Sequence, residues 1–391
     1  MRITEVSPVL LRGDESYGPR SGAAEAVDQG DWLLLVRVRT DAGLEGWSDV
    51  ETLGPVAARV LSGPGMGALG FRGIAEETVG KDPLDIEGIW TDLYLATAYY
   101  GRRGVVMHCM SAVDNCLWSI RAQAAGVPLS EVLGGRRRDR LPAYASTLFR
   151  ATPDENQAAA AGYARMGFRA VKFGWGGFGI DPGLDRENLA AIREALGPER
   201  ELMVDPGWYV HDGGRPRVRT YAQTRAMLEI VADVVPYWVE DFVHPECPAD
   251  YHQAKLEFPT LRFAAGEQQA TIWDFRRLIH EGGVDVLQPD LSRCGGLTVA
   301  KAVAAEAERA GREIVTHSWL TDLLHAYSLA YLATLHDAHW VEFNVAQSAL
   351  SRGVVTTRLS LAADGTVAIP DGIGLGMAVD QEFIRSCQVV V

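Results

Sequence analysis

The chain has 391 residues, enough for two domains, and carries 37 Lys and Arg against 51 Asp and Glu, a net charge of −14. A protein this acidic, without a cluster of basic residues on a helical face, is not expected to bind nucleic acid. No run of about 18 apolar residues occurs, so no membrane span is predicted. The N-terminus lacks the apolar core of a signal peptide, and the 5 scattered cysteines indicate reduced thiols, so we expect a cytoplasmic protein.

The first section, residues 1–135, has an α+β pattern. Residues 31–40, DWLLLVRVRT, favour a β-strand, and Asp41-Ala42-Gly43 then predicts a turn into a second strand, GLEGWSDV. From about residue 75 to residue 125 the apolar residues recur at helical spacing. We therefore expect a hairpin followed by helices.

The second section, residues 136–352, alternates short apolar runs with helical segments. The eight runs are LPAYAST, AVKFGW, ELMVDP, YWVED, RFAAGE, VDVLQPD, EIVTHS and WVEFN, and seven helical segments separate them. Strict alternation predicts a parallel sheet, and eight strands closing on themselves give a TIM-type barrel with its active groups at the carboxyl ends of the strands. The last segment, 353–391, has short β-like runs and is expected to pack back on the first section.

Most of these apolar runs end in a polar or charged residue. In chain order these residues are Lys172, Asp205, Glu240, Glu267, Asp290, His317 and Glu342. A single one would more often be a loop cap, a structural histidine or a lysine that reaches solvent. Because seven consecutive strands of a closed barrel each contribute one, we expect the seven side chains to converge on one mouth.

Three of these residues form a candidate metal site. Asp205, Glu240 and Glu267 would repel one another and have raised pKa values unless a cation lay between them. Three carboxylates without Cys or His suit Mg²⁺ better than zinc.

The other four residues then acquire roles around that site. His317 titrates near neutral pH, and Asp290 on the preceding strand can orient its ring as a His–carboxylate dyad. Lys172 is expected on the side of the mouth opposite His317. Glu342 can hydrogen-bond a bound anion if it is protonated.

This set of residues resembles the enolase superfamily, and within it the mandelate racemase subgroup. The motifs LMVDPGW, YWVEDF and AAGEQ are similar to the metal-ligand strands, VLQPDLSRCGGLT and VTHSW to the strands of the Asp–His dyad, and HWVEFN to the eighth strand. The resemblance covers nearly the whole chain. It implies a modified (β/α)7β barrel under a capping domain, formed by the N-terminal section and the C-terminal tail. It also implies Mg²⁺-assisted removal of the proton α to a carboxylate.

The chain departs from the family pattern at three places. The strand-two motif of the family has a second lysine two residues after the first, and here Gly174 takes that place. Because side chains alternate along a strand, residues 172 and 174 face the same way, so that face lacks its usual base. Asp241 stands where a second Glu is usual, and Gly207 where Asn is frequent.

One base favours elimination over racemisation, which needs a base on each face of the substrate. We therefore predict elimination: His317 removes the α-proton, the β-hydroxyl leaves as water, and a 2-keto-3-deoxy acid results. This reaction resembles that of the family's acid-sugar dehydratases, which implies a Mg²⁺-dependent acid-sugar dehydratase. The alternatives are a racemase or epimerase of a hydroxy acid, and a non-catalytic barrel relative. A muconate-type cycloisomerase fits less well, since Asp290 stands where that type has lysine.

The expected partner is a small carboxylate substrate, a sugar acid, and we expect a homo-oligomer. Specificity is expected to come from the loops 14–30 and 51–56 and from aromatic residues at the mouth. The candidates are Trp47, Tyr99, Trp175, Trp208, Tyr209, His211 and Trp319. His211 is also a candidate for a separate general acid.

Overall fold

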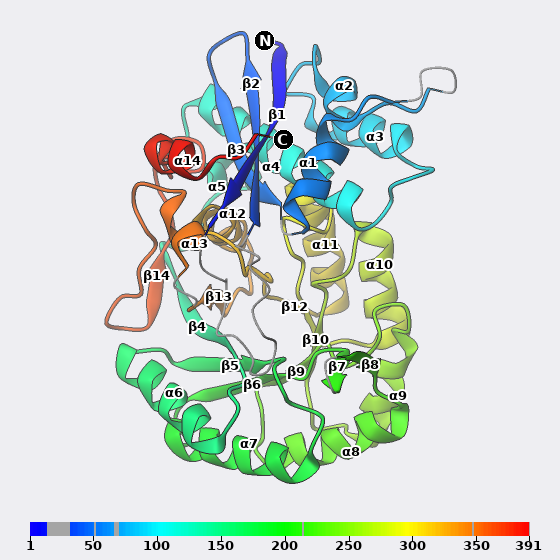
Figure 1. Ribbon diagram of the computed structural model, residues 1–391, viewed down its shortest axis with the longest axis vertical. Helices are drawn as coiled ribbons and strands as arrows, with labels where there is room; N and C mark the ends of the chain where they lie inside the picture. The colour runs from blue at the N-terminus through cyan, green and yellow to red at the C-terminus, as the bar shows by residue number, and fades with distance from the viewer. Residues whose placement is uncertain (14–31, 51, 66–69, 213–214, 346–347, 391) are drawn as a thin grey trace.

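The computed structural model describes residues 1–13, 32–50, 52–65, 70–212, 215–345 and 348–390. A barrel of parallel strands and surrounding helices forms the lower part of the molecule in Figure 1, and a smaller α+β domain covers it. The expected loops 14–30 and 51–56 lie wholly or partly outside the described residues. No helix in the described ranges is long and apolar enough to cross a membrane.

The barrel consists of the eight predicted strands. They are β4 (Arg140–Leu148), β5 (Ala170–Gly174), β6 (Glu201–Asp205), β9 (Trp238–Glu240), β10 (Phe263–Ala265), β11 (Val286–Leu287), β12 (Glu313–Ile314) and β13 (Val341–Asn344). Their order is β12-β11-β10-β9-β6-β5-β4-β13, with all neighbours parallel. The backbone N–H of Ser318, after β12, donates to Glu342 on β13 and links the two ends of this order. The predicted TIM-type barrel is confirmed.

Seven helical segments connect these strands, as the alternation predicts. They are α6 (Pro153–Met166), α7 (Pro182–Leu196), α8 (Tyr221–Ala232), α9 (Ala249–Glu257), α10 (Thr271–Arg277) with a π-helical turn (Leu278–Gly282), α11 (Gly296–Ala310) and α12 (Asp322–Leu332). Local sequence fixes where several of them begin. Thr152 and Glu155 form a capping box at the start of α6, and the side chain of Asp181 accepts from two N–H groups of α7.

The covering domain is built on an antiparallel three-stranded sheet. Its strands are β1 (Ile3–Arg12), β2 (Trp32–Thr40) and β3 (Glu45–Val50), and its helices are α1 (Gly54–Ser62), α2 (Ile74–Thr78), α3 (Ile86–Ala96), α4 (Val105–Ala125) and α5 (Leu129–Leu133). The predicted β2–β3 hairpin is present, and Gly43 turns its chain with a φ of +78° that glycine adopts without strain.

Helix α4 joins this domain to the barrel through buried polar contacts. Asp114 accepts hydrogen bonds from the backbone N–H and the hydroxyl of Thr298, at 2.9 and 2.6 Å. Asn115 donates to the carbonyl of Leu291 at 2.9 Å and accepts from the N–H of Leu297 at 3.1 Å. These partners belong to the segment that follows Asp290, so α4 holds the chain just beyond the predicted dyad.

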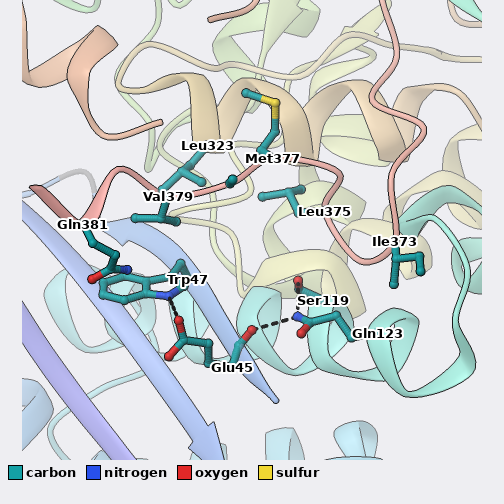
Figure 2. Close-up of a pocket in the computed structure, with 11 residues that line it drawn as sticks. Glu45, Trp47, Ser119, Gln123, Leu323, Ile373, Leu375, Met377, Val379 and Gln381 are labelled. Carbon is teal, nitrogen blue, oxygen red and sulfur yellow. Dashed lines mark hydrogen bonds between the residues drawn. The ribbon is translucent and has the colours of Figure 1, made fainter. Parts of the chain in front are cut away.

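The C-terminal tail contacts both parts of the molecule. It contains α13 (Ala349–Gly353), β14 (Thr366–Ala368) and α14 (Gln381–Cys387), and β14 pairs antiparallel with β4 of the barrel. Beyond α14, the N–H of Val389 donates to the carbonyl of Leu10 in β1 at 2.8 Å. Figure 2 shows a cavity of about 450 Å³ between β3, α4 and this tail, with Trp47 on one wall and Met377 on another.

One of the elements that the sequence did not predict lies beside the barrel mouth. A two-stranded hairpin, β7 (Tyr209–Asp212) and β8 (Arg215–Val218), stands between β6 and α8. It follows directly on Asp205, so it forms part of the wall around the barrel mouth.

Candidate active site

A cavity of about 500 Å³ opens at the carboxyl ends of the barrel strands. Lys172, Asp205, Glu267 and His317 line it. All seven residues predicted from the strand ends are buried, with exposed fractions from 0% to 6%. The structure therefore gathers the predicted side chains at one end of the barrel, although it does not arrange them all as the sequence suggested.

Lys172, on β5, is held by carboxylates. Its Nζ lies 2.5 Å from Glu240, 3.0 Å from Glu342 and 3.9 Å from Asp205. Burial alone would lower the pKa of this lysine, but Glu240 and Glu342 raise it overall, well above the ordinary value. Lys172 is thus a fixed cation facing the cavity, which is a suitable partner for a substrate carboxylate.

His317 and Asp290 form the predicted dyad. The Nδ1 atom of His317 lies 2.6 Å from Asp290, whose other oxygen accepts from the N–H and the hydroxyl of Ser292, both at 2.6 Å. Asp290 therefore fixes the ring and favours the tautomer with its proton on Nδ1. The Nε2 atom points towards the carboxylates and lies 3.0 Å from Glu267. Burial lowers the pKa of His317, but Glu267, Glu342 and Asp290 raise it overall.

The three predicted metal ligands lie at the ends of neighbouring strands, but the structure engages their oxygens with other partners. Glu240 accepts from Lys172, Trp238 and Gln288, and Glu267 lies against His317 and accepts from Gln268. Within the described ranges, no three His, Cys, Asp or Glu side chains are grouped so that they could hold a metal ion as they stand.

The charge at this end of the barrel nevertheless fits a cation. Burial, and then the nearby charge of Glu240, raises the pKa of Asp205 well above its ordinary value, even though Lys172 acts the other way. Burial and Glu267 raise the pKa of Asp241 in the same way. One oxygen of Asp241 is buried and has no hydrogen-bond partner, and its backbone has a φ of +43°. These acidic oxygens are the donors that a Mg²⁺ ion prefers.

Glu342 differs from its expectation as a protonated hydrogen-bond donor. Burial would raise its pKa, but Lys172 and His317 lower it overall. One oxygen accepts from the N–H of Ser318 and the other lies beside Lys172. Glu342 is therefore an ionised residue that holds the lysine, because Lys172 and His317 both favour its charged form.

The space beside Gly174 is occupied by Asp205, not by an aromatic ring. A Cβ atom at position 174 would lie 2.9 Å from the Oδ2 of Asp205 and 3.1 Å from its Cβ. The ring of Trp175 packs over Gly207. A larger residue at 174 would thus require the carboxylate of Asp205 to move.

Four of the predicted aromatic residues do line the cavity: Trp175, Trp208, Tyr209 and Trp319. Trp175 and Trp208 both meet the ring of Tyr209 edge-on, at 4.9 and 4.7 Å between ring centroids. Two others do not line this cavity. Trp47 borders the cavity of Figure 2, and Tyr99 is 86% exposed against Phe71. His211 is in β7, and its side chain lies outside the part of the chain that the structure describes.

Sequence reasoning missed Arg293, Gln288 and Trp238. Arg293 lines the cavity, 3.6 Å from Glu267 and 3.8 Å from Asp290. Gln288 and Trp238 hold Glu240 from inside the barrel. Arg293 stands three residues after Asp290, where a basic residue near a strand end was a usable signal. Gln288 and Trp238 gave no such signal, because each belongs to an apolar run that reads as a typical strand.

Two family models match this chain. Residues 12–134 match the N-terminal domain of mandelate racemase / muconate lactonizing enzyme, and residues 155–383 match the enolase C-terminal domain-like model. The chain belongs to the enolase superfamily. The mandelate racemase subgroup that the motifs suggested is supported, and the barrel under a capping domain is the fold of the superfamily's solved members.

Individual members of the superfamily agree with this assignment. The chain is 30% identical to a D-galactarolactone cycloisomerase from Agrobacterium fabrum, over 90% of each protein. It is 28% identical to a D-galactonate dehydratase from Xanthomonas euvesicatoria, again over 90% of each. A superfamily member from Polaromonas has a solved structure that superposes with a TM-score of 0.86 at 27% identity, over 100% of this chain and 98% of that one. These relatives support an enzyme.

Proposed function

We propose that this protein is a Mg²⁺-dependent acid-sugar dehydratase. His317 removes the proton α to the substrate carboxylate, and the bond from the β-carbon to its hydroxyl oxygen breaks. The hydroxide accepts a proton from the imidazolium and leaves as water, and the enol product becomes a 2-keto-3-deoxy acid. Substrate minus one water gives the product, so no oxidant or reductant is needed.

The choice between elimination and racemisation depends on whether a second base lies on the substrate face opposite His317. Among the described residues that line the cavity, His317 is the one histidine and Lys172 the one lysine. Lys172 is engaged by Glu240 and Glu342, and a side chain at position 174 would collide with Asp205. Racemisation needs a second base that returns the proton to the other face, whereas elimination proceeds with one. The geometry therefore favours elimination.

The residues proposed to hold the metal are Asp205, Glu240 and Glu267. A bound Mg²⁺ would neutralise charge that develops on the substrate carboxylate as its α-proton leaves. The raised pKa values of Asp205 and Asp241 are consistent with this site: burial raises them first, and the neighbouring acidic groups raise them further. Asp241 lies next to Glu240 and adds to the negative potential.

The remaining groups bind the substrate and orient the base. Lys172 is placed to pair with a substrate carboxylate, and Arg293 adds a second positive charge at the same cavity. Asp290 holds Nδ1 of His317, so that Nε2 is the atom available for proton transfer. The edge-to-face rings of Trp175, Trp208 and Tyr209 form a wall that limits water.

The test is a screen of mono- and diacid sugars for 2-keto acid formation with Mg²⁺ present. We expect at least one acid to be dehydrated by the wild-type protein and not by His317→Asn. Gly177→Ala serves as a folded control, because a Cβ there meets nothing within 4 Å. Full turnover by His317→Asn would rule out this residue as the base.

A cycloisomerase is a second candidate, because a relative of that name is 30% identical over 90% of the chain. The same base would serve a cyclic acid, with a ring oxygen leaving the β-carbon in place of hydroxide, so that no water is released. Comparing a lactone with the open-chain acid as substrate separates the two. Epimerised product would instead favour the racemase reading, and failure to bind Mg²⁺ would favour a non-catalytic relative.

A further inference from the structure

A second cavity, of about 500 Å³, lies behind the β7–β8 hairpin. Tyr209 lines the active-site cavity, whereas the next residue, Val210, lines this one. Successive side chains of a strand point to opposite sides, so the hairpin separates the two spaces. The other walls are the turn at Gly179 and Ile180 and the start of α8.

Arg219 lines this cavity and is only 8% exposed. Its Nη1 donates to the carbonyl of Pro206 at 3.2 Å. Its Nε and Nη2 atoms are fully buried and have no hydrogen-bond partner. Burial lowers the pKa of this guanidinium to about 10, so it remains a cation. A buried charged donor without a partner is costly, which indicates that something else satisfies it.

The acidic groups nearest to Arg219 do not fill this role. Asp205 and Asp185 act on it electrostatically, but neither forms an ion pair with it within the described ranges. Both oxygens of Asp185 accept instead from the N–H of Gly179, at 3.1 and 3.0 Å. Burial raises the pKa of Asp185 to about 7, so at neutral pH it supplies only part of a charge.

The cavity is positive as a whole. Its described lining contains Arg217 and Arg219 and no acidic residue. Thr220 is the N-cap of α8, a helix of 12 residues, and it lines the cavity together with Gln223. The amino end of a helix carries a partial positive charge that favours anions.

We infer that this second cavity binds a small oxyanion, a phosphate or the carboxylate of a short organic acid, at the guanidinium of Arg219. A planar guanidinium can donate to two oxygens of such an anion side by side. The site is separate from the proposed reaction, since the hairpin lies between them, and either claim can fail without the other.

The test is calorimetric titration of the metal-free protein with inorganic phosphate and, separately, with malonate, at ionic strength held constant with chloride. We expect one saturable site per chain, and competition between the two anions will identify which is preferred. EDTA in the buffer keeps magnesium phosphate out of the measurement.

Two variants locate the site. Val218→Glu places a carboxylate at the rim, where Val218 is 53% exposed, and should weaken binding at least about tenfold while it leaves Arg219 in place. Leu256→Glu, at a 65% exposed position on α9, makes the same charge change elsewhere and should bind like wild type. Arg219→Lys keeps the charge but loses the two-donor geometry, and should also weaken binding.

Absence of saturable binding would overturn the inference. Equal affinity in wild type and Val218→Glu would do so as well, because the anion would then occupy another place, such as the surroundings of Lys172.

Discussion

At the scale of single residues, Gly174 is one of three positions at which this chain departs from the family pattern. Alternation along β5 predicted that residues 172 and 174 face the same side, and the structure agrees. That alternation could not predict what occupies the vacated space, because Asp205 comes from the neighbouring strand. Contacts between strands depend on register, here Gly174 opposite Asp205, which the sequence of one strand does not contain.

Replacement of Gly174 by alanine is expected to weaken Mg²⁺ binding by about tenfold, on the order of 1.4 kcal/mol. The new Cβ would lie 2.9 Å from the Oδ2 of Asp205 and push that carboxylate away. Isothermal titration with Mg²⁺ measures this without any substrate. Gly177→Ala is the matched control, and equal affinity in the two variants would show that Asp205 does not bind the ion.

Asp290→Asn should lower kcat by roughly three to four orders of magnitude with little change in KM, by analogy with other His–carboxylate pairs. An amide can donate to Nδ1 of His317, so the ring is held in the tautomer with its proton on the wrong nitrogen. Steady-state kinetics on the substrate found in the screen would measure it. A variant with near-normal kcat would mean that Asp290 is structural only.

At the scale of elements, α4 and the segment after β11 form the contact that joins the two parts of the molecule. Its central group, Asp114, is fully buried, and burial raises its pKa to about 7 despite two hydrogen bonds from Thr298. Helical spacing predicted α4, but not that a polar residue on it would be buried against the barrel.

The raised pKa of Asp114 makes the stability of the folded protein depend on pH. Between pH 4 and pH 7 the folded protein keeps a proton on Asp114 that the unfolded chain has released, so this contribution to stability falls as pH rises. Asp114→Asn keeps the shape and removes the titration. The free energy of unfolding of the wild-type protein, measured in urea, should therefore exceed that of the variant by more at pH 5 than at pH 8. A difference that stays constant or grows with pH would contradict the raised pKa.

The β7–β8 hairpin is an element that the sequence did not predict. The sequence HDGGRP does contain the glycine pair that is typical of hairpins. However, all four residues of β8 are exposed and one is proline, so the strand lacks the alternating apolar pattern on which the prediction depended. Elements that face solvent and do not pack on a core show only a weak alternation of apolar and polar residues in the sequence.

At the scale of the whole molecule, the barrel order and its functional end followed from the alternation of strands and helices. The sequence predicted that the tail packs on the first section, as the residues beyond α14 do against β1, but it did not predict that β14 pairs with β4 of the barrel. Those pairings join segments far apart in the chain. The homo-oligomer and the cytoplasmic location remain predictions, which light scattering and cell fractionation would test.

Magnesium should stabilise the folded protein, because it is expected to bind only the assembled carboxylates. At 100 times its Kd the gain is about 2.7 kcal/mol, which should raise Tm by several degrees. Scanning calorimetry with MgCl₂ and with NaCl of equal ionic strength measures it. Glu267→Gln should lose the effect. A Tm that responds equally to both salts would argue against a specific site.

In the proposed reaction one imidazole, His317, removes the α-proton, and elimination follows. The most direct measurement is proton NMR of the reaction in D₂O with Mg²⁺ and the sugar acid found in the screen. We predict loss of the α-proton signal, formation of a 2-keto-3-deoxy acid deuterated at C3, and neither change with His317→Asn. Substrate that is epimerised without elimination, or product formed at the wild-type rate by His317→Asn, would contradict the account.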